Sequence, residues 1–232
     1  MPLQLKLYHY WRSSASWRVR FAFAAKGIQV DLIPLNLLLG ESETPEHLKR
    51  NPLGHVPVLE VTDQSGPDAG KPRYLAESLA IIEWAEEIYP TNPLLPADSW
   101  LRARVRQLAE IINAGTQPLT NLGVASFHPS YPGSGQPSQS SAPAQEKAWN
   151  QHWMHRGLEA YEMIVRETAG KFSVGDTLTM ADICLVPQCY SAGRFDVSLQ
   201  SFPTLARINE QVLKLESCQA AHPDRFAPQS PR

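Results

Sequence analysis

Two hydroxyl side chains, Ser13 and Ser14, lie between an apolar stretch, Leu3–Tyr10, and a segment with helical character over 14–26 that ends at Gly27. The first N–H groups of a helix have no partner within the helix, and they attract anions. A serine hydroxyl at this corner can donate a hydrogen bond to such an anion. The alternative is that one of the two serines is only a helix N-cap. These residues alone leave both interpretations open.

A second candidate for binding is the segment His55-Val56-Pro57, at the beginning of the apolar stretch Val56–Val61. A cis bond before Pro57 would turn the backbone N–H and C=O of Val56 outward. Backbone groups presented in this way pair with a peptide as an added strand would. The alternative is that Pro57 only shapes a turn.

A third candidate is Glu77-Ser78, where a helix over Glu77–Ile88 begins directly after a predicted strand. The hydroxyl and the N–H of Ser78 suit a carboxylate, and the Glu77 carboxylate can accept from an ammonium group. The alternative is that both residues only cap the helix. Together with Ser13 and Val56, these groups suit a small zwitterionic peptide, provided that one sheet brings them together.

The first 88 residues alternate short apolar strands with helical segments, which predicts a four-stranded sheet with helices packed on it. Residues 29–36 and the preceding strand and helix form a βαβ unit, hence parallel strands. A polar loop over 62–72 separates the last two strands. The predicted elements are strands over Leu3–Tyr10, Gln29–Asn36, Val56–Val61 and Arg73–Leu75, and helices over 14–26, Pro45–Arg50 and Glu77–Ile88.

After residue 88 the pattern changes. Three prolines in Tyr89–Pro96 cannot continue a helix, so residues 89–97 are predicted to be a linker. Residues 98–225 are predicted to form an all-helical domain, and 226–232 a flexible tail. A segment over 127–145, rich in Ser, Pro and Gly, is predicted to be a mobile loop. The helices of this domain are expected at roughly 98–125, 145–169, 179–192 and 203–217.

Thr179-Met-Ala-Asp182 has the form of a capping box and precedes the apolar run Ile183–Val186. Asp182 could be taken for a catalytic carboxylate. A reciprocal helix cap is the better interpretation, since the spacing of three residues is that of the box. We therefore assign Asp182 to folding.

Composition and charge narrow the class of protein. The chain has 232 residues, 19% of them charged, and a formal net charge of −2, which gives no indication of a nucleic-acid partner. The N-terminus lacks the apolar core of a signal peptide, and no apolar run is long enough for a membrane span. Cys184, Cys189 and Cys218 lack the spacing of a zinc site, so no metal is expected. Buried free thiols in the cytoplasm are the expected state.

The chain resembles the zeta class of glutathione transferases. The stretch Ser13–Arg20, with sequence SSASWRVR, is close to the zeta-class signature SSCxWRVR. Further matching blocks follow in the same order along nearly the whole chain, excepting the loops 62–72 and 127–145. These blocks are Asn51-Pro52, Val56-Pro57, Glu77–Glu83, Gln117–Leu122, Thr179–Gln188, Ser191–Phe195 and Ala221-His222-Pro223.

The resemblance implies a thioredoxin-like N-terminal domain, βαβ then ββα, followed by a helical C-terminal domain, in a homodimer. It implies glutathione as the cofactor and Ser13 as the donor that stabilises its thiolate, with Ser14 as the supporting hydroxyl. The glutathione-binding residues that it implies are Ser13, Ser14, His55, Val56, Pro57, Glu77, Ser78, Gln117 and Asn121.

Two positions depart from the family pattern. Ala15 stands where the signature has cysteine, which excludes a covalent role for a thiol there. That cysteine is not the usual thiolate stabiliser, so activity does not require it. Glu77 stands where the family often has glutamine, and it adds an acceptor for the glutathione amine.

The zeta class includes isomerases that convert maleylacetoacetate to fumarylacetoacetate in phenylalanine and tyrosine breakdown, by reversible addition of the glutathione thiolate. We expect the same reaction here, with a dicarboxylate substrate held by Arg12 and Arg194 and with Trp11 lining the cleft. Arg18 is a competing candidate, with an interdomain salt bridge as its other interpretation. A surface position without a role is the alternative for Arg12, Arg18 and Arg194, and core packing is the alternative for Trp11. Rival activities are isomerisation of maleylpyruvate, conjugation or dehalogenation of electrophiles, and a non-catalytic association domain of this fold.

Overall fold

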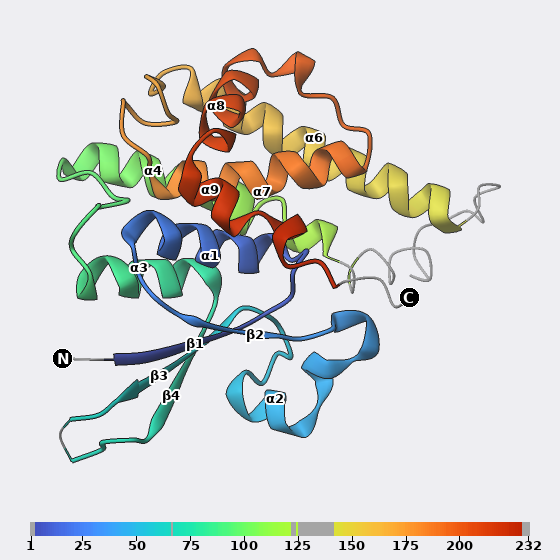
Figure 1. Ribbon diagram of the computed structural model, residues 1–232. Helices are drawn as coiled ribbons and strands as arrows, with labels where there is room; N and C mark the ends of the chain where they lie inside the picture. The colour runs from blue at the N-terminus through green and yellow to red at the C-terminus, as the bar shows by residue number, and fades with distance from the viewer. Residues whose placement is uncertain (1–2, 66, 122–123, 125–141, 229–232) are drawn as a thin grey trace. The chain divides into compact units, whose positions relative to one another are not determined.

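The computed structural model describes residues 3–65, 67–121, 124 and 142–228. Contacts divide the chain into two units: unit 1 is Met1–Leu94 with Lys214–Arg232, and unit 2 is Leu95–Leu213. The helices and strands of Figure 1 are β1 Leu3–His9, α1 Ser14–Lys26, β2 Asp31–Pro34, α2 Pro45–Arg50, β3 Val58–Asp63, β4 Pro72–Ala76, α3 Ser78–Ile88, α4 Ser99–Asn113, α6 Ala142–Val165, α7 Met180–Arg194, α8 Pro203–Leu213 and α9 Glu216–Ala221.

Unit 1 is built on a four-stranded sheet of order β2-β1-β3-β4. β1 and β2 are parallel, as the βαβ pattern predicts, whereas β3 is antiparallel to both β1 and β4. Tyr8 is paired with Val58, and Val58 with Ala76. The mixed sheet with its helices confirms the predicted α/β architecture of the first domain.

Helix α1 is the buried centre of unit 1. Ser13 caps its N-terminus, and Gly27 ends it with a φ of 72°, a backbone conformation that favours glycine. The helix is buried on nearly all sides because α3 and α9 both pack against it, while α2 lies on the other side of the sheet (Figure 1). A helix that is buried all round needs apolar residues on every face, and Trp17, Phe21 and Phe23 are almost fully buried.

The C-terminal segment departs from the expected domain boundary. Residues 203–217 read as one helix in the sequence, but the structure divides them into α8 and α9, with Leu215 in an extended conformation. α8 belongs to unit 2, whereas α9 belongs to unit 1, where Cys218 and Ala221 are buried. The helical unit therefore ends at Leu213 rather than at residue 225, because α9 completes the burial of α1.

Unit 2 is formed by α4, α6, α7 and α8, which confirms the predicted helical domain. Its core helix is α7, buried from Met180 to Cys189. The capping box at its N-terminus is present: the Asp182 carboxylate accepts from the N–H and the hydroxyl of Thr179, both at 2.8 Å, and from the N–H of Ser173 at 2.8 Å. Asp182 is therefore a folding residue.

Two further expectations concern segments of unit 2. The helix expected over 98–125 ends at Asn113, and a 3-10 turn follows at Pro118–Thr120. Most of the predicted mobile loop lies outside the described residues, and its last residues, 142–145, belong to α6. Among the helices that the structure describes, none is long and apolar enough to cross a membrane.

The close approach of α6 to the end of α4 gives a stability prediction. A Cβ at Gly157 would collide with the buried side chain of Thr116. We expect Gly157→Ala to lower the free energy of unfolding by about 1–3 kcal/mol through overpacking, measured by denaturant titration. Gly193→Ala is the matched control, because a Cβ there meets no atom within 4 Å in α7. Equal stability of the two variants would contradict this packing.

Candidate functional site

Three turns lie at one edge of the sheet of unit 1. The register pairs Tyr8, near the end of β1, with Val58, where β3 begins, and Val58 with Ala76, where β4 ends. One turn, residues 10–13, follows β1. A second, residues 55–57, precedes β3, and a third, residues 77–78, follows β4. The structure therefore brings the three predicted binding segments of the first domain to the same edge of the sheet.

Ser13 is the N-cap of α1, and this cap leaves its hydroxyl hydrogen available. Its Oγ accepts from the N–H of Ser16 at 3.2 Å, and its own N–H donates to the Tyr10 carbonyl at 3.1 Å. A hydroxyl has one hydrogen to donate besides the lone pairs with which it accepts. The capping role and the donor role are therefore compatible at Ser13, although the sequence presents them as alternatives.

The residues that precede Ser13 form a half-buried aromatic and cationic pair. The guanidinium carbon of Arg12 lies 5.3 Å from the centre of the Trp11 ring. Trp11 is half-buried and is not part of the core. Ser14 is the first residue of α1 and is also half-buried.

The loop before β3 contains the cis bond that the sequence suggested, between Val56 and Pro57. The carbonyl of the preceding residue, His55, accepts from His47 Nε2 at 3.0 Å and from Asn51 Nδ2 at 3.1 Å. Val56 and Pro57 are buried, whereas the His55 side chain is exposed. Side chains from α2 and its C-terminus thus fix the backbone on which Val56 is presented.

At the third turn, Ser78 is buried and its neighbour Glu77 is exposed. Arg18 of α1 donates from Nη1 to Ser78 Oγ at 3.2 Å. Since the hydroxyl accepts from Arg18, its hydrogen remains available for an outside acceptor. Arg18 is fully buried, so its interpretation as a surface arginine is wrong; in this structure it supports Ser78 from behind.

Glu77 has a φ of 68° and makes no capping hydrogen bond with its side chain. A non-glycine residue at positive φ costs of order 1–3 kcal/mol, and such residues cluster at functional sites. We expect Glu77→Gly to keep or raise the melting temperature while weakening binding of a zwitterionic peptide ligand about tenfold. Calorimetry on both proteins measures this, with Glu77→Gln as the variant that keeps an acceptor. Unchanged affinity in Glu77→Gly would show that the side chain does not touch the ligand.

The other predicted site residues belong to unit 2. Gln117 and Asn121 flank the 3-10 turn at Pro118–Thr120, and Trp149 of α6 donates from Nε1 to the Leu119 carbonyl of this turn at 2.6 Å. Arg194 is the exposed last residue of α7, with its guanidinium carbon 5.9 Å from the centre of the Phe195 ring. Their roles stay predictions.

The three cysteines are free and buried, as expected. Burial raises the pKa of the Cys218 thiol to about 12, and it raises the pKa of Cys189 as well. A protonated, buried thiol is a poor nucleophile. Cys189 and Cys218 are therefore poor nucleophiles in this structure.

Some residues that hold the turns from within were not predicted from the sequence, among them His47 and Arg18 in its supporting role. A signal for Arg18 was present: Arg18 and Arg20 lie in a helix whose other residues from Trp17 to Ala25 are apolar. Such a helix is buried, and a buried arginine must find acceptors. No comparable pattern marks His47.

Comparison with known proteins identifies the family. Residues 7–93 match the model of the glutathione S-transferase N-terminal domain, and residues 128–220 match the model of the C-terminal domain. A maleylacetoacetate isomerase from Mus musculus is 41% identical over 94% of this chain and 92% of its own length.

Solved structures agree with this. A maleylacetoacetate isomerase from Anaeromyxobacter dehalogenans 2CP-1, with glutathione bound in its active site, is 44% identical with a TM-score of 0.83 over 99% of both chains. The same protein was solved with dicarboxyethyl glutathione and citrate in the active site. A zeta-class maleyl pyruvate isomerase is 34% identical with a TM-score of 0.83, over 97% of this chain and 100% of its own. The chain thus belongs to the glutathione S-transferase family, in the zeta-class branch that includes the maleylacetoacetate isomerases.

Proposed function

We propose that this chain is a glutathione-dependent isomerase that converts maleylacetoacetate to fumarylacetoacetate, a step in phenylalanine and tyrosine breakdown. The observation that carries the proposal is the Ser13 hydroxyl at the N-terminus of α1, which accepts from the Ser16 N–H at 3.2 Å and keeps its hydrogen for an anion. The 41% identity to the mouse isomerase supports the choice of reaction.

The polar groups at the sheet edge suit glutathione. Ser78 presents a hydroxyl and a helix N-terminal N–H for a carboxylate, and the exposed Glu77 supplies an acceptor for an ammonium group. The Val56 backbone suits the peptide portion, with His55 and Pro57 shaping its loop. Gln117 and Asn121 of unit 2 are proposed as further contacts on the basis of the family motif.

Glutathione supplies a thiolate that adds reversibly to the cis double bond, so that rotation can occur before the thiolate leaves. A free thiol with a pKa near 8.5 is mostly protonated at neutral pH, and lowering that pKa by two units requires about 2.7 kcal/mol. A hydrogen bond from a hydroxyl at a helix N-terminus can supply a free energy of this magnitude. We assign the donor to Ser13, with Ser14 in support.

The substrate carries two carboxylates, and we assign their recognition to Arg12 and Arg194, with Trp11 lining the site. Arginine matches a carboxylate with two parallel N–H donors. The ring contact between Arg12 and Trp11 limits the freedom of the Arg12 side chain. The Anaeromyxobacter relative was solved with dicarboxyethyl glutathione and citrate in its active site, which supports recognition of carboxylates together with glutathione.

The rival functions are separated by one comparison of rates. Purified protein is assayed with glutathione and each of three substrates: maleylacetoacetate, maleylpyruvate and an uncharged electrophile. Our proposal expects the highest kcat/KM for maleylacetoacetate. A higher value for maleylpyruvate would reassign the substrate, a higher value for the electrophile would make the chain a general transferase, and no turnover with any of them would favour the non-catalytic association domain.

We also propose that the chain is a cytoplasmic homodimer. Three buried free thiols suit a reducing compartment. Large apolar side chains are exposed on both units, among them Trp100, 70% exposed on α4, and Ile88, 47% exposed on α3. We expect an interface between unit 1 of one subunit and unit 2 of the other.

The dimer is tested by sedimentation at micromolar concentration. We expect about twice the mass of the 25.9 kDa chain. A monomer under these conditions would contradict the dimer.

A further inference from the structure

Arg20 is a buried cation of α1 that lies behind the turn carrying Ser13. It is 4% exposed. Its Nη2 donates to the Trp11 carbonyl at 3.0 Å and its Nη1 to the Tyr10 carbonyl at 3.4 Å. The guanidinium therefore bridges two successive carbonyls of residues 10–13, which we call the catalytic turn.

These bonds fix the backbone that orients Ser13. The Tyr10 carbonyl accepts from the Ser13 N–H at 3.1 Å as well as from Arg20. If the peptide group of Tyr10 or of Trp11 rotated away from Arg20, the hydrogen bond between the Ser13 N–H and the Tyr10 carbonyl would also be disturbed. The Ser13 hydroxyl must be placed to within a few tenths of an ångström if it is to donate a good hydrogen bond to the sulfur. The position of the turn therefore matters for catalysis.

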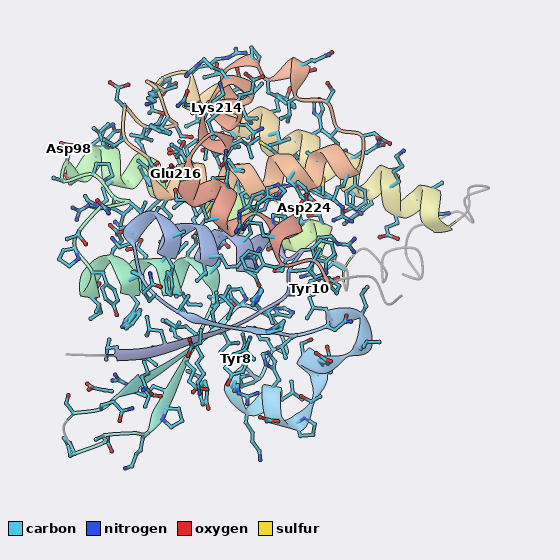
Figure 2. The ribbon with its side chains drawn as sticks, in the orientation of Figure 1. Tyr8, Tyr10, Asp98, Lys214, Glu216 and Asp224 are labelled. Atoms are coloured by element: carbon cyan, nitrogen blue, oxygen red, sulfur yellow. The ribbon has the colours of Figure 1, made fainter. Side chains whose placement is uncertain are left out.

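The C-terminal segment of unit 1 holds Arg20 from its other side. Arg20 Nε donates to the Ala221 carbonyl at 3.3 Å, and its guanidinium carbon lies 4.7 Å from the centre of the Phe226 ring. Of the residues labelled in Figure 2, Tyr10 lies in the catalytic turn, and Glu216 and Asp224 lie in the C-terminal segment. Arg20 thus connects the catalytic turn to residues 221–226.

His9 completes the surroundings of the guanidinium. Its Nδ1 lies 3.0 Å from Arg20 Nη1, and its ring packs edge-on against Phe226 at 5.7 Å. Burial and the charge of Arg20 lower the pKa of His9 to about 4, so the ring is neutral at pH 7 and accepts from Arg20. Burial lowers the pKa of Arg20 to about 9, so it remains a cation.

The hydrogen-bond partners that the structure describes for Arg20 are carbonyls and a neutral imidazole, and none is a carboxylate. A buried cation is costly unless hydrogen bonds or an opposite charge compensate for its loss of hydration. Here its positive charge stands directly behind a turn that we assign to a thiolate, where it favours the anion.

We propose that Arg20, held by the C-terminal segment through Ala221 and Phe226, is a positioning residue that fixes the catalytic turn and thereby aims the Ser13 hydroxyl at the glutathione sulfur. This inference rests on the proposed role of Ser13. It makes residues 221–226, far from Ser13 in the sequence, part of the machinery that tunes the thiol.

The test uses Arg20→Met in the full chain, with two readouts. Hydrogen exchange of the Ser13 amide, measured without glutathione, is expected to be at least about tenfold faster, because the carbonyls of the turn lose their charged donor. The pKa of bound glutathione, measured by the ultraviolet absorbance of its thiolate, is expected to rise by about one unit. Arg20→Lys keeps the positive charge but not the several N–H groups of the guanidinium, and should give intermediate values of both readouts.

Lys26→Met is the matched control. Lys26 is also a buried cation of α1 and donates to two successive backbone carbonyls, those of Thr91 and Asn92, as well as to Glu86. Its loss is expected to lower stability without changing either readout. If Lys26→Met shifts both readouts as much as Arg20→Met does, the effect is general destabilisation and the inference is wrong.

Phe226→Ala keeps the test decisive if Arg20→Met does not fold. It removes the ring above the guanidinium, and it should change both readouts in the same direction by a smaller amount. Unchanged Ser13 exchange and unchanged thiol pKa in the folded Arg20 or Phe226 variants would overturn the inference. Ser13→Ala, measured alongside, separates the donor role of Ser13 from the positioning role of Arg20. An unchanged thiol pKa in Ser13→Ala would count against Ser13 as the donor. The effect of Arg20 on the exchange of the Ser13 amide would still stand.

Discussion

Replacement of Ser13 by alanine is expected to raise the pKa of bound glutathione by about one to two units, because the thiolate loses a hydrogen bond worth about 1.5–3 kcal/mol. At pH 7, kcat for isomerisation should then fall about 3- to 25-fold, because the thiol pKa rises from about 6.5 to about 7.5–8.5 and the thiolate fraction falls in proportion. The loss should disappear at alkaline pH, where glutathione ionises without help. A pH series of kcat measures the shift.

Ser13 also caps α1, so its loss has a cost in stability that must be separated from the catalytic effect. Asp98 offers a matched cap: its Oδ1 accepts from the N–H of Leu101 at 2.8 Å at the start of α4. Asp98→Ala should cost about 1 kcal/mol of stability and leave the pH profile unchanged. Equal turnover of Ser13→Ala and the unmodified protein at pH 7 would move the donor role to Ser14 or to the backbone.

Removal of Arg12 or Arg194 is expected to lower kcat/KM for maleylacetoacetate about 10- to 150-fold, because each loses a charge-assisted hydrogen bond to a substrate carboxylate. Conjugation of an uncharged electrophile requires no such bond and should change little. The ratio of the two kcat/KM values in each variant therefore reports on carboxylate recognition.

Exposed arginines elsewhere serve as controls for the loss of a surface charge. Arg73 lies in β4 of unit 1, and Arg207 in α8 of unit 2. Alanine at either position should leave both reactions unchanged. If Arg12→Ala and Arg194→Ala impair both reactions equally, these arginines support the fold or glutathione binding, and the dicarboxylate assignment loses its basis.

The sequence predicted most of the fold because its local signals agree with one another. Ser13 and Gly27 mark both ends of α1, and the capping box at Thr179 marks the start of α7. It did not predict the division near Lys214, because the apolar period continues across the break between α8 and α9. Which unit a short helix joins depends on the surface that it covers, and that surface is far away in the sequence.

The places of Ser13 and Ser78 at the N-termini of α1 and α3 were predictable, because each follows a strand and precedes a helical pattern. The supporting contacts were not predictable, because they join residues remote in sequence: Arg18 reaches Ser78, and Arg20 reaches Ala221, 201 positions further along. A buried arginine in an apolar helix indicates that acceptors exist, but it does not indicate which ones. Only the folded chain supplies them.

The proposed reaction differs from conjugation in one countable quantity, the glutathione consumed for each product molecule. The most direct test incubates the purified protein with maleylacetoacetate and a small amount of glutathione, and follows fumarylacetoacetate together with the free thiol. Regeneration of the thiol predicts many product molecules for each glutathione present, with the free thiol constant throughout. Loss of one thiol for each substrate molecule consumed, or no trans product in the presence of glutathione, would contradict the proposed function.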